Sequence, residues 1–143
     1  MYRRGFLAAS GAVAAAGLAG CSSLSFSREE LSLTVINRDD TLRRVGVDLL
    51  LRNADELDRA RVYSREIAVP AASDDGPSVV RRDDVVESRP YVVRVDLVGR
   101  RERVAPYHFY PDCAGESGPE ERLYVDLVPT ENGVRVGFDQ NGC

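Results

Sequence analysis

The sequence predicts an all-β domain built as an antiparallel two-sheet sandwich of about seven to nine short strands. Three observations support this fold class. After residue 30, apolar and polar residues alternate with a period of two, helical periodicity is almost absent, and turn-forming residues recur about every ten residues. The 143 residues, of which 43% are hydrophobic, are enough for one domain with one core. We expect this domain to occupy residues 31–143.

The first half of the domain contains three predicted strands. Apolar side chains alternate with polar ones over 31–35, 43–52 and 62–70. The segment Asn37–Asp40 is typical of a turn between the first two strands, and Pro70 ends the third. Residues 53–61 are ambiguous, because Asp55 could cap a short helix.

The second half adds six predicted strands. Strands are predicted over 79–80, 85–86, 91–97, 104–110, 123–127 and 134–138. The first two resemble edge strands on either side of the charged segment Arg81–Asp84. Proline and glycine make 111–119 a loop, and the Asn132-Gly133 step favours a hairpin between the last two strands.

One strand resembles a feature of a known class of sandwich. Tyr91-x-Val93-x-Val95, after Arg89-Pro90, is similar to the tyrosine-bearing strand of immunoglobulin-like and fibronectin-like domains. The resemblance implies an immunoglobulin-like sandwich over most of residues 31–139, with the phenol oxygen hydrogen-bonded to the backbone. The tryptophan and inter-sheet cysteine pair of antibody domains are missing. A small up-and-down barrel is the alternative architecture.

The N-terminus carries a targeting pattern. Arg3-Arg4 precedes Phe6-Leu7 and an apolar segment over 7–19, which resembles a twin-arginine export signal. As a helix this segment would span about 20 Å, well short of the roughly 30 Å hydrocarbon core of a bilayer. We therefore expect residues 1–20 to be a cleaved signal peptide and not a membrane span.

The residues that follow resemble a lipobox, Leu18-Ala19-Gly20-Cys21. The resemblance implies that a diacylglyceryl group is attached to the Cys21 thiol, that Cys21 becomes the first residue, and that residues 21–30 form a tether. Two acyl chains are sufficient for stable membrane anchoring. The alternatives are a secretory signal cleaved without lipid attachment and an N-terminal helix that merely contains two arginines.

The composition is acidic and lacks lysine. All 19 basic residues are arginine, and 23 acidic residues give a net charge of −4. Together with the export signal, this composition resembles the exported lipoproteins of halophilic archaea. The resemblance implies a chain anchored on the outer side of the cytoplasmic membrane. The acidic balance disfavours a nucleic-acid partner, since nucleic-acid binding depends on neutralising phosphates.

Two cysteines remain after Cys21, namely Cys113 and Cys143. Export would place them where thiols are not kept reduced, so we expect a disulfide bond between them. Closing a loop of about 30 residues would restrict the unfolded chain by roughly 3.7 kcal/mol. The alternative is a metal or redox site formed by His108, Asp112 and Cys113.

The sequence contains little that predicts catalysis. His108 is the single histidine, and its place in the aromatic segment Tyr107–Tyr110 favours a structural role. Phosphate-binding glycine loops and the His-Glu-x-x-His motif are absent from the sequence. We therefore expect no catalytic residue, no cofactor and no resident metal. The alternative function is a secreted enzyme or a metal or electron carrier that uses His108 with nearby carboxylates or Cys113.

The sequence offers two weaker candidate sites. Asp39-Asp40 or Asp74-Asp75 could offer oxygen ligands to calcium, and Tyr107–Tyr110 with the arginines at 100, 101 and 103 could form a partner-binding patch. Paired acids are more simply explained as solvated loops than as a glycoside-hydrolase pair. The sequence-based hypothesis is thus a lipid-anchored binding or structural module, with an envelope protein as its candidate partner or an accessory role beside a membrane transporter.

Overall fold

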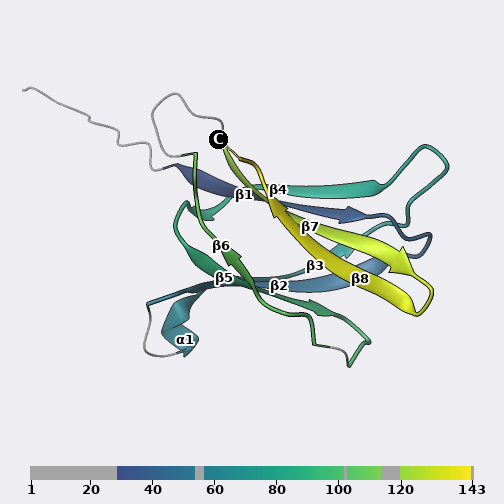
Figure 1. Ribbon diagram of the computed structural model, residues 1–143, viewed down its shortest axis with the longest axis horizontal. Helices are drawn as coiled ribbons and strands as arrows, with labels where there is room; N and C mark the ends of the chain where they lie inside the picture. Colours follow the sequence, from purple (N-terminus) through teal and green to yellow (C-terminus); the bar gives the residue numbers. More distant parts are fainter. Residues whose placement is uncertain (1–28, 54–56, 102, 114–119, 143) are drawn as a thin grey trace, which may run out of the picture.

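The computed structural model describes residues 29–53, 57–101, 103–113 and 120–142, which form two four-stranded β-sheets packed face to face (Figure 1). The strands are β1 (Glu30–Asn37), β2 (Arg43–Leu51), β3 (Arg61–Val69), β4 (Ser78–Glu87), β5 (Tyr91–Leu97), β6 (Tyr107–Phe109), β7 (Glu121–Thr130) and β8 (Gly133–Gln140). The predicted two-sheet sandwich is therefore confirmed.

The strand order is β4-β1-β7-β8 in one sheet and β3-β2-β5-β6 in the other. Neighbouring strands of the described residues are antiparallel except for β1 and β7, which run parallel. In immunoglobulin constant domains the first, second, fourth and fifth strands share one sheet. Here β1 and β2 lie in different sheets, so the chain shares the two-layer sandwich with those domains but not their strand order.

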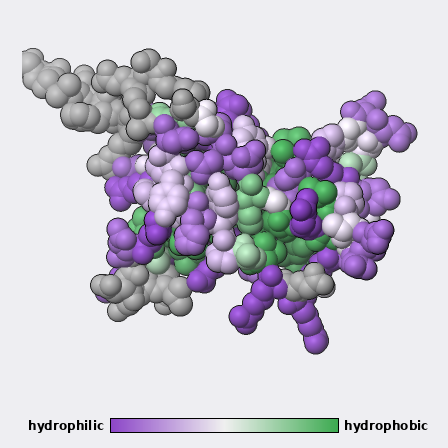
Figure 2. Space-filling view, in the orientation of Figure 1, coloured by the Kyte–Doolittle hydropathy of each residue, from purple (hydrophilic) through white to green (hydrophobic). Residues whose placement is uncertain are grey.

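The alternating sequence pattern accounts for the core. On β5, Tyr91, Val93, Val95 and Leu97 are buried, whereas Arg94 and Asp96 are exposed. Successive side chains of a strand point to opposite faces, so the apolar set of each strand faces the other sheet. Each fully buried Val or Leu contributes about 1.5–3 kcal/mol. Hydrophilic side chains cover most of the face seen in Figure 2.

The strand β4 differs from its prediction. The two short segments expected around Arg81–Asp84 are one strand of 10 residues that pairs with β1. The charged residues are exposed on an edge strand, so they do not interrupt its backbone pairing. A register shift between Leu31 and Leu33, together with a positive φ of 50° at Asp84, distorts this edge. Such charges and irregularities protect a sheet edge from pairing with other chains.

Two connections between strands can be compared with their predictions. A four-residue helix, α1 (Leu57–Ala60), leads into β3, while Asp55 lies outside the described residues. The predicted hairpin is confirmed: β7 and β8 pair with Thr130 opposite Gly133. Gly133 has a φ of 132°, and a Cβ there would lie 1.7 Å from Nη2 of Arg100. The positive φ favours glycine at this position, whereas the contact is with the end of the flexible Arg100 side chain, which can move.

The tyrosine resemblance has a structural counterpart. The buried Tyr91 donates its hydroxyl hydrogen to the Glu87 carbonyl at 2.5 Å, which ties the start of β5 to the end of β4. This bond lies at the end of the sandwich where β1 begins and β8 ends. We call it the tail end, because the described chain enters there at Glu29.

We expect Tyr91→Phe to lower the free energy of unfolding by about 1 kcal/mol, because the partly buried Glu87 carbonyl loses its donor. Chemical denaturation measures this loss. Tyr124→Phe is the matched control, since Tyr124 lies on the outer face of β7 and should change stability by much less. Equal effects of the two substitutions would show that the hydroxyl of Tyr91 contributes nothing specific.

Candidate functional site

Several predicted site residues lie outside the described residues, namely Arg3, Arg4, Phe6, Leu7, Cys21 and Cys143. Export, lipid attachment and the pairing of Cys143 therefore stay predictions. Within the described residues, no helix has the length and apolar character needed to cross a membrane. The described chain begins at Glu29, whose carbonyl accepts the Ser88 N–H at 2.8 Å.

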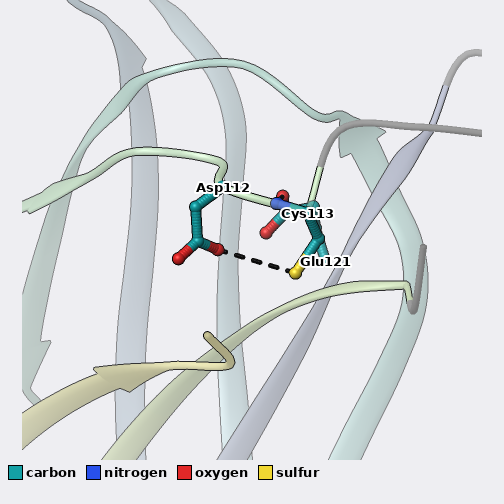
Figure 3. A group of neighbouring side chains, drawn as sticks. All are labelled: Asp112, Cys113 and Glu121. Carbon is teal, nitrogen blue, oxygen red and sulfur yellow. Dashed lines mark hydrogen bonds between the residues drawn. The ribbon is translucent and has the colours of Figure 1, made fainter. Parts of the chain in front are cut away.

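Three potential ligand groups gather at the tail end. Ligand atoms of Asp112, Cys113 and Glu121 all lie within 4.8 Å of one another, and we call this group the Glu121 cluster (Figure 3). Asp112 and Cys113 belong to the segment that follows β6, and Glu121 is the first residue of β7. The cluster thus connects the two sheets of the sandwich, because β6 and β7 belong to different sheets.

Glu121 is the buried acid of this cluster. It shares the inward face of β7 with Leu123, Val125 and Leu127 and is fully buried. Its Oε1 accepts the Cys113 N–H at 2.5 Å, whereas Oε2 has no hydrogen-bond partner among the described residues. Burial raises the pKa of the Glu121 carboxyl above its ordinary value, against the lowering effect of the Cys113 N–H. The Asp112 carboxylate also raises the Glu121 pKa by charge repulsion, whereas the Asp112 backbone lowers it by hydrogen bonding.

Sequence reasoning missed Glu121 and treated Glu120-Glu121 as a solvated acidic pair. The signal was present, because Glu121 continues the alternation of Leu123, Val125 and Leu127 by one more step. Its partly exposed neighbour Glu120 does behave as a surface acid, accepting a hydrogen bond from Arg81 at 2.8 Å. Alternation therefore separates the two acids that composition alone had grouped together.

Cys113 is buried and disulfide-bonded. Its Sγ lies 3.5 Å from Oδ1 of Asp112 and 3.9 Å from the carbonyl oxygen of Asn141. Metals bind the thiolate of cysteine. A disulfide-bonded sulfur is not available in that form, so the Glu121 cluster as it stands offers a metal two carboxylates. The other two cysteines of the chain, Cys21 and Cys143, lie outside the described residues.

The C-terminal segment is held beside Cys113 by Asn141. The side-chain Oδ1 of Asn141 accepts the Arg122 N–H at 2.7 Å, and its Nδ2 donates to the Glu120 carbonyl at 2.8 Å. Its backbone N–H donates to the Arg122 carbonyl at 3.2 Å. These three bonds continue the attachment of the chain to β7 beyond the end of β8. Asn141 precedes Cys143 by two residues, so this anchoring favours the predicted pairing of the two cysteines.

His108 does not belong to this cluster. It is exposed on β6, opposite Val92 of β5, whereas the neighbouring Phe109 is fully buried. Tyr107 stacks on Phe138 of β8 with ring centroids 5.2 Å apart. The alternative site of His108, Asp112 and Cys113 is thus not assembled among the described residues: Glu121 takes the place that was suggested for His108.

The loop acids considered for calcium have different surroundings. Asp39 is buried and accepts a hydrogen bond from Nε of Arg43 at 2.7 Å. This bond lowers the pKa of the Asp39 carboxyl below its ordinary value. Asp39 also accepts the Asp40 N–H, so it braces the loop after β1. Asp74 and Asp75 are exposed in the turn closed by Ser73 and Gly76.

The proposed aromatic and arginine patch is divided in the structure. Arg100 donates to the Val134 carbonyl at 3.4 Å, and Tyr107 packs on β8, while Arg101 and Arg103 are exposed. Tyr110 instead contacts Arg52, whose guanidinium carbon lies 4.8 Å above the Tyr110 ring centroid. Arg52 also donates a hydrogen bond to the Tyr110 hydroxyl.

A pocket of about 340 Å³ opens beside Arg52 at the tail end. Its lining consists of Leu51, Arg52, Asn53, Arg89 and Pro90. These residues meet because β2 and β5 pair with Leu51 opposite Tyr91. Sequence reasoning predicted both strands but not that they are neighbours, so it did not bring the two arginines together.

The chain was also compared with known proteins. No protein-family model matches it, and neither does any curated protein.

We expect Glu121→Gln to stabilise the protein at pH 7. With a raised folded-state pKa, the folded protein binds the Glu121 proton more tightly than the unfolded chain does. In the unfolded chain the glutamate pKa is about 4.3. Below this pH, ionisation of Glu121 costs no stability, and the cost grows as the pH rises above it. The advantage of Glu121→Gln should thus disappear at low pH. Denaturation curves between pH 4 and 7 measure it.

Glu131→Gln, in the exposed turn between β7 and β8, is the matched control and should show no such pH-dependent gain. A Glu121→Gln protein that follows the wild-type stability at every pH would contradict the assigned cost of the buried carboxylate.

Proposed function

We propose that the protein is a lipid-anchored sandwich domain on the outer side of the cytoplasmic membrane, serving as a binding or structural module of the cell envelope. The observation that carries this proposal is the order of the N-terminal residues. Arg3-Arg4, the apolar segment and the lipobox cysteine Cys21 follow one another within 21 residues. A chain with this order carries an export signal and offers one thiol for acylation.

The link between anchor and domain is short. Cys21 and Glu29 are eight residues apart, and a fully extended chain spans at most about 3.6 Å per residue. An acylated Cys21 would therefore hold Glu29 within about 29 Å of the membrane surface. The tail end of the sandwich would face the lipid, and the loops at the opposite end would face outward.

The chemistry of Cys113 supports an oxidising compartment. Disulfides persist in exported proteins and are rare in the cytosol. Asn141 fixes the chain close to the Cys113 sulfur, and Cys143 follows two residues later. We propose that Cys113 and Cys143 form the disulfide bond and that this bond attaches the C-terminal segment to the segment that follows β6.

A second candidate is a metal carrier, and the Glu121 cluster is the observation that favours it. It would require Cys113 as a thiolate, with Asp112 and Glu121 as the carboxylate ligands. A disulfide at Cys113 and a metal at this cluster exclude each other. The state of Cys113 in the isolated protein therefore decides between the two candidates.

We expect Cys21→Ser to abolish acylation, so that the protein is retained uncleaved or shed from the membrane. Replacing Arg3 and Arg4 by lysine should block export, because the paired arginines are the part of the signal that the export machinery recognises. Fractionation of cells and mass spectrometry of the N-terminal peptide measure both effects. A wild-type protein that is soluble in the cytoplasm would contradict the proposal.

Cys143→Ser should lower the melting temperature by several degrees without affecting export or the anchor. Without the disulfide bond the unfolded chain gains conformational entropy, which lowers the free energy of unfolding by a few kcal/mol, while the core strands remain. Wild-type protein alkylated under native, non-reducing conditions should show no free thiol at either position. Alkylation of both Cys113 and Cys143, accompanied by bound metal, would favour the metal carrier.

A further inference from the structure

We infer that the pocket at the tail end, lined by Arg52, Asn53 and Arg89, is a binding site for a phosphate group. The lining combines two guanidinium groups and an amide with the apolar side chains of Leu51 and Pro90. Arginine binds phosphate through parallel N–H donors. A site of this composition fits a phosphate that carries an apolar portion.

Arg52 is held in place by its neighbours. Its guanidinium stacks at 4.8 Å over the Tyr110 ring and donates to the Tyr110 hydroxyl. The backbone of Tyr110 is in turn fixed by Gln140, whose Nε2 donates to the Tyr110 carbonyl at 2.7 Å. Because Arg52 is oriented before a ligand arrives, less side-chain entropy is lost on binding.

Arg89 is also positioned by neighbouring residues. It forms an ion pair with Glu87 at 2.9 Å, and the following Pro90 fixes the backbone at the start of β5. The backbone carbonyl of Glu87 also accepts a hydrogen bond from the Tyr91 hydroxyl. Glu87 is therefore fixed where β4 ends and β5 begins. A guanidinium has five N–H donors, so one ion pair leaves donors on Arg89 for an anion.

The pocket lies where the chain enters the domain. The Ser88 N–H donates to the Glu29 carbonyl, and Arg89 is the next residue. The phosphate could therefore belong to a membrane lipid or to a soluble molecule, and both have the same recognition chemistry. The inference itself does not depend on acylation of Cys21, because it concerns the pocket alone.

The test uses the full chain carrying Cys21→Ser, so that acyl groups cannot cause membrane binding. Phosphorus NMR and calorimetry at low salt follow binding of inorganic phosphate. Arg52→Gln and Arg89→Gln should each weaken phosphate binding by about tenfold. Arg135→Gln is the matched control, since it removes the same charge from the exposed face of β8 and should leave binding unchanged.

A second arm uses co-sedimentation with vesicles of phosphatidylglycerol and, separately, of phosphatidylcholine. Binding of phosphate and of phosphatidylglycerol vesicles, both lost with Arg52→Gln, assigns the pocket to an anionic lipid headgroup. Binding of phosphate alone assigns it to a soluble phosphate compound. Absence of phosphate binding, or equal weakening by Arg135→Gln, would overturn the inference.

Discussion

The parallel pairing of β1 and β7 is the constraint on which the rest of the sandwich depends. β1 lies between β4 and β7, and its inward residues Leu31, Leu33 and Val35 are fully buried. Pairing residue by residue from Leu31 opposite Glu121 fixes which side chains of β7 face the other sheet. A shift by one residue would turn Leu123 and Val125 outward and remove both from the core.

This register also explains the Glu121 cluster. Leu123, Val125 and Leu127 face inward, so Glu121, which continues the same alternation at the start of β7, must also face inward. The fold accommodates the carboxylate by directing the Cys113 N–H at it. The acid and the cysteine, which are eight residues apart in the sequence, are thus held together by strand register.

Much of the fold could be predicted from the sequence, because alternation is a local property. The strands around Val47, Val93 and Val125 were each visible as period-two patterns. The partners of each strand could not be read in this way, since pairing depends on contacts between distant residues. The unbroken β4 and the Arg52–Arg89 pocket were missed for this reason: the first is supported by β1, and the second arises where β2 and β5 pair.

The candidate site was predicted less well than the fold. His108 is the single histidine of the chain and therefore a candidate base or ligand, yet its position on β6 faces outward. Glu121 was hidden among many acids, although its place in the alternating pattern distinguished it. Residue type suggests chemistry, but the face of a strand decides whether a side chain is available for it.

The pairing of β1 with β7 has a consequence for the time course of folding. Leu31 and Glu121 are neighbours in the sheet but are separated by about 90 residues of chain. While the chain is being synthesised, β1 can pair with β4, but its other edge must wait for β7 to emerge. Sheets closed by such distant pairings form slowly, over milliseconds to seconds. The nascent domain therefore exposes one side of its first strand until β7 has been synthesised.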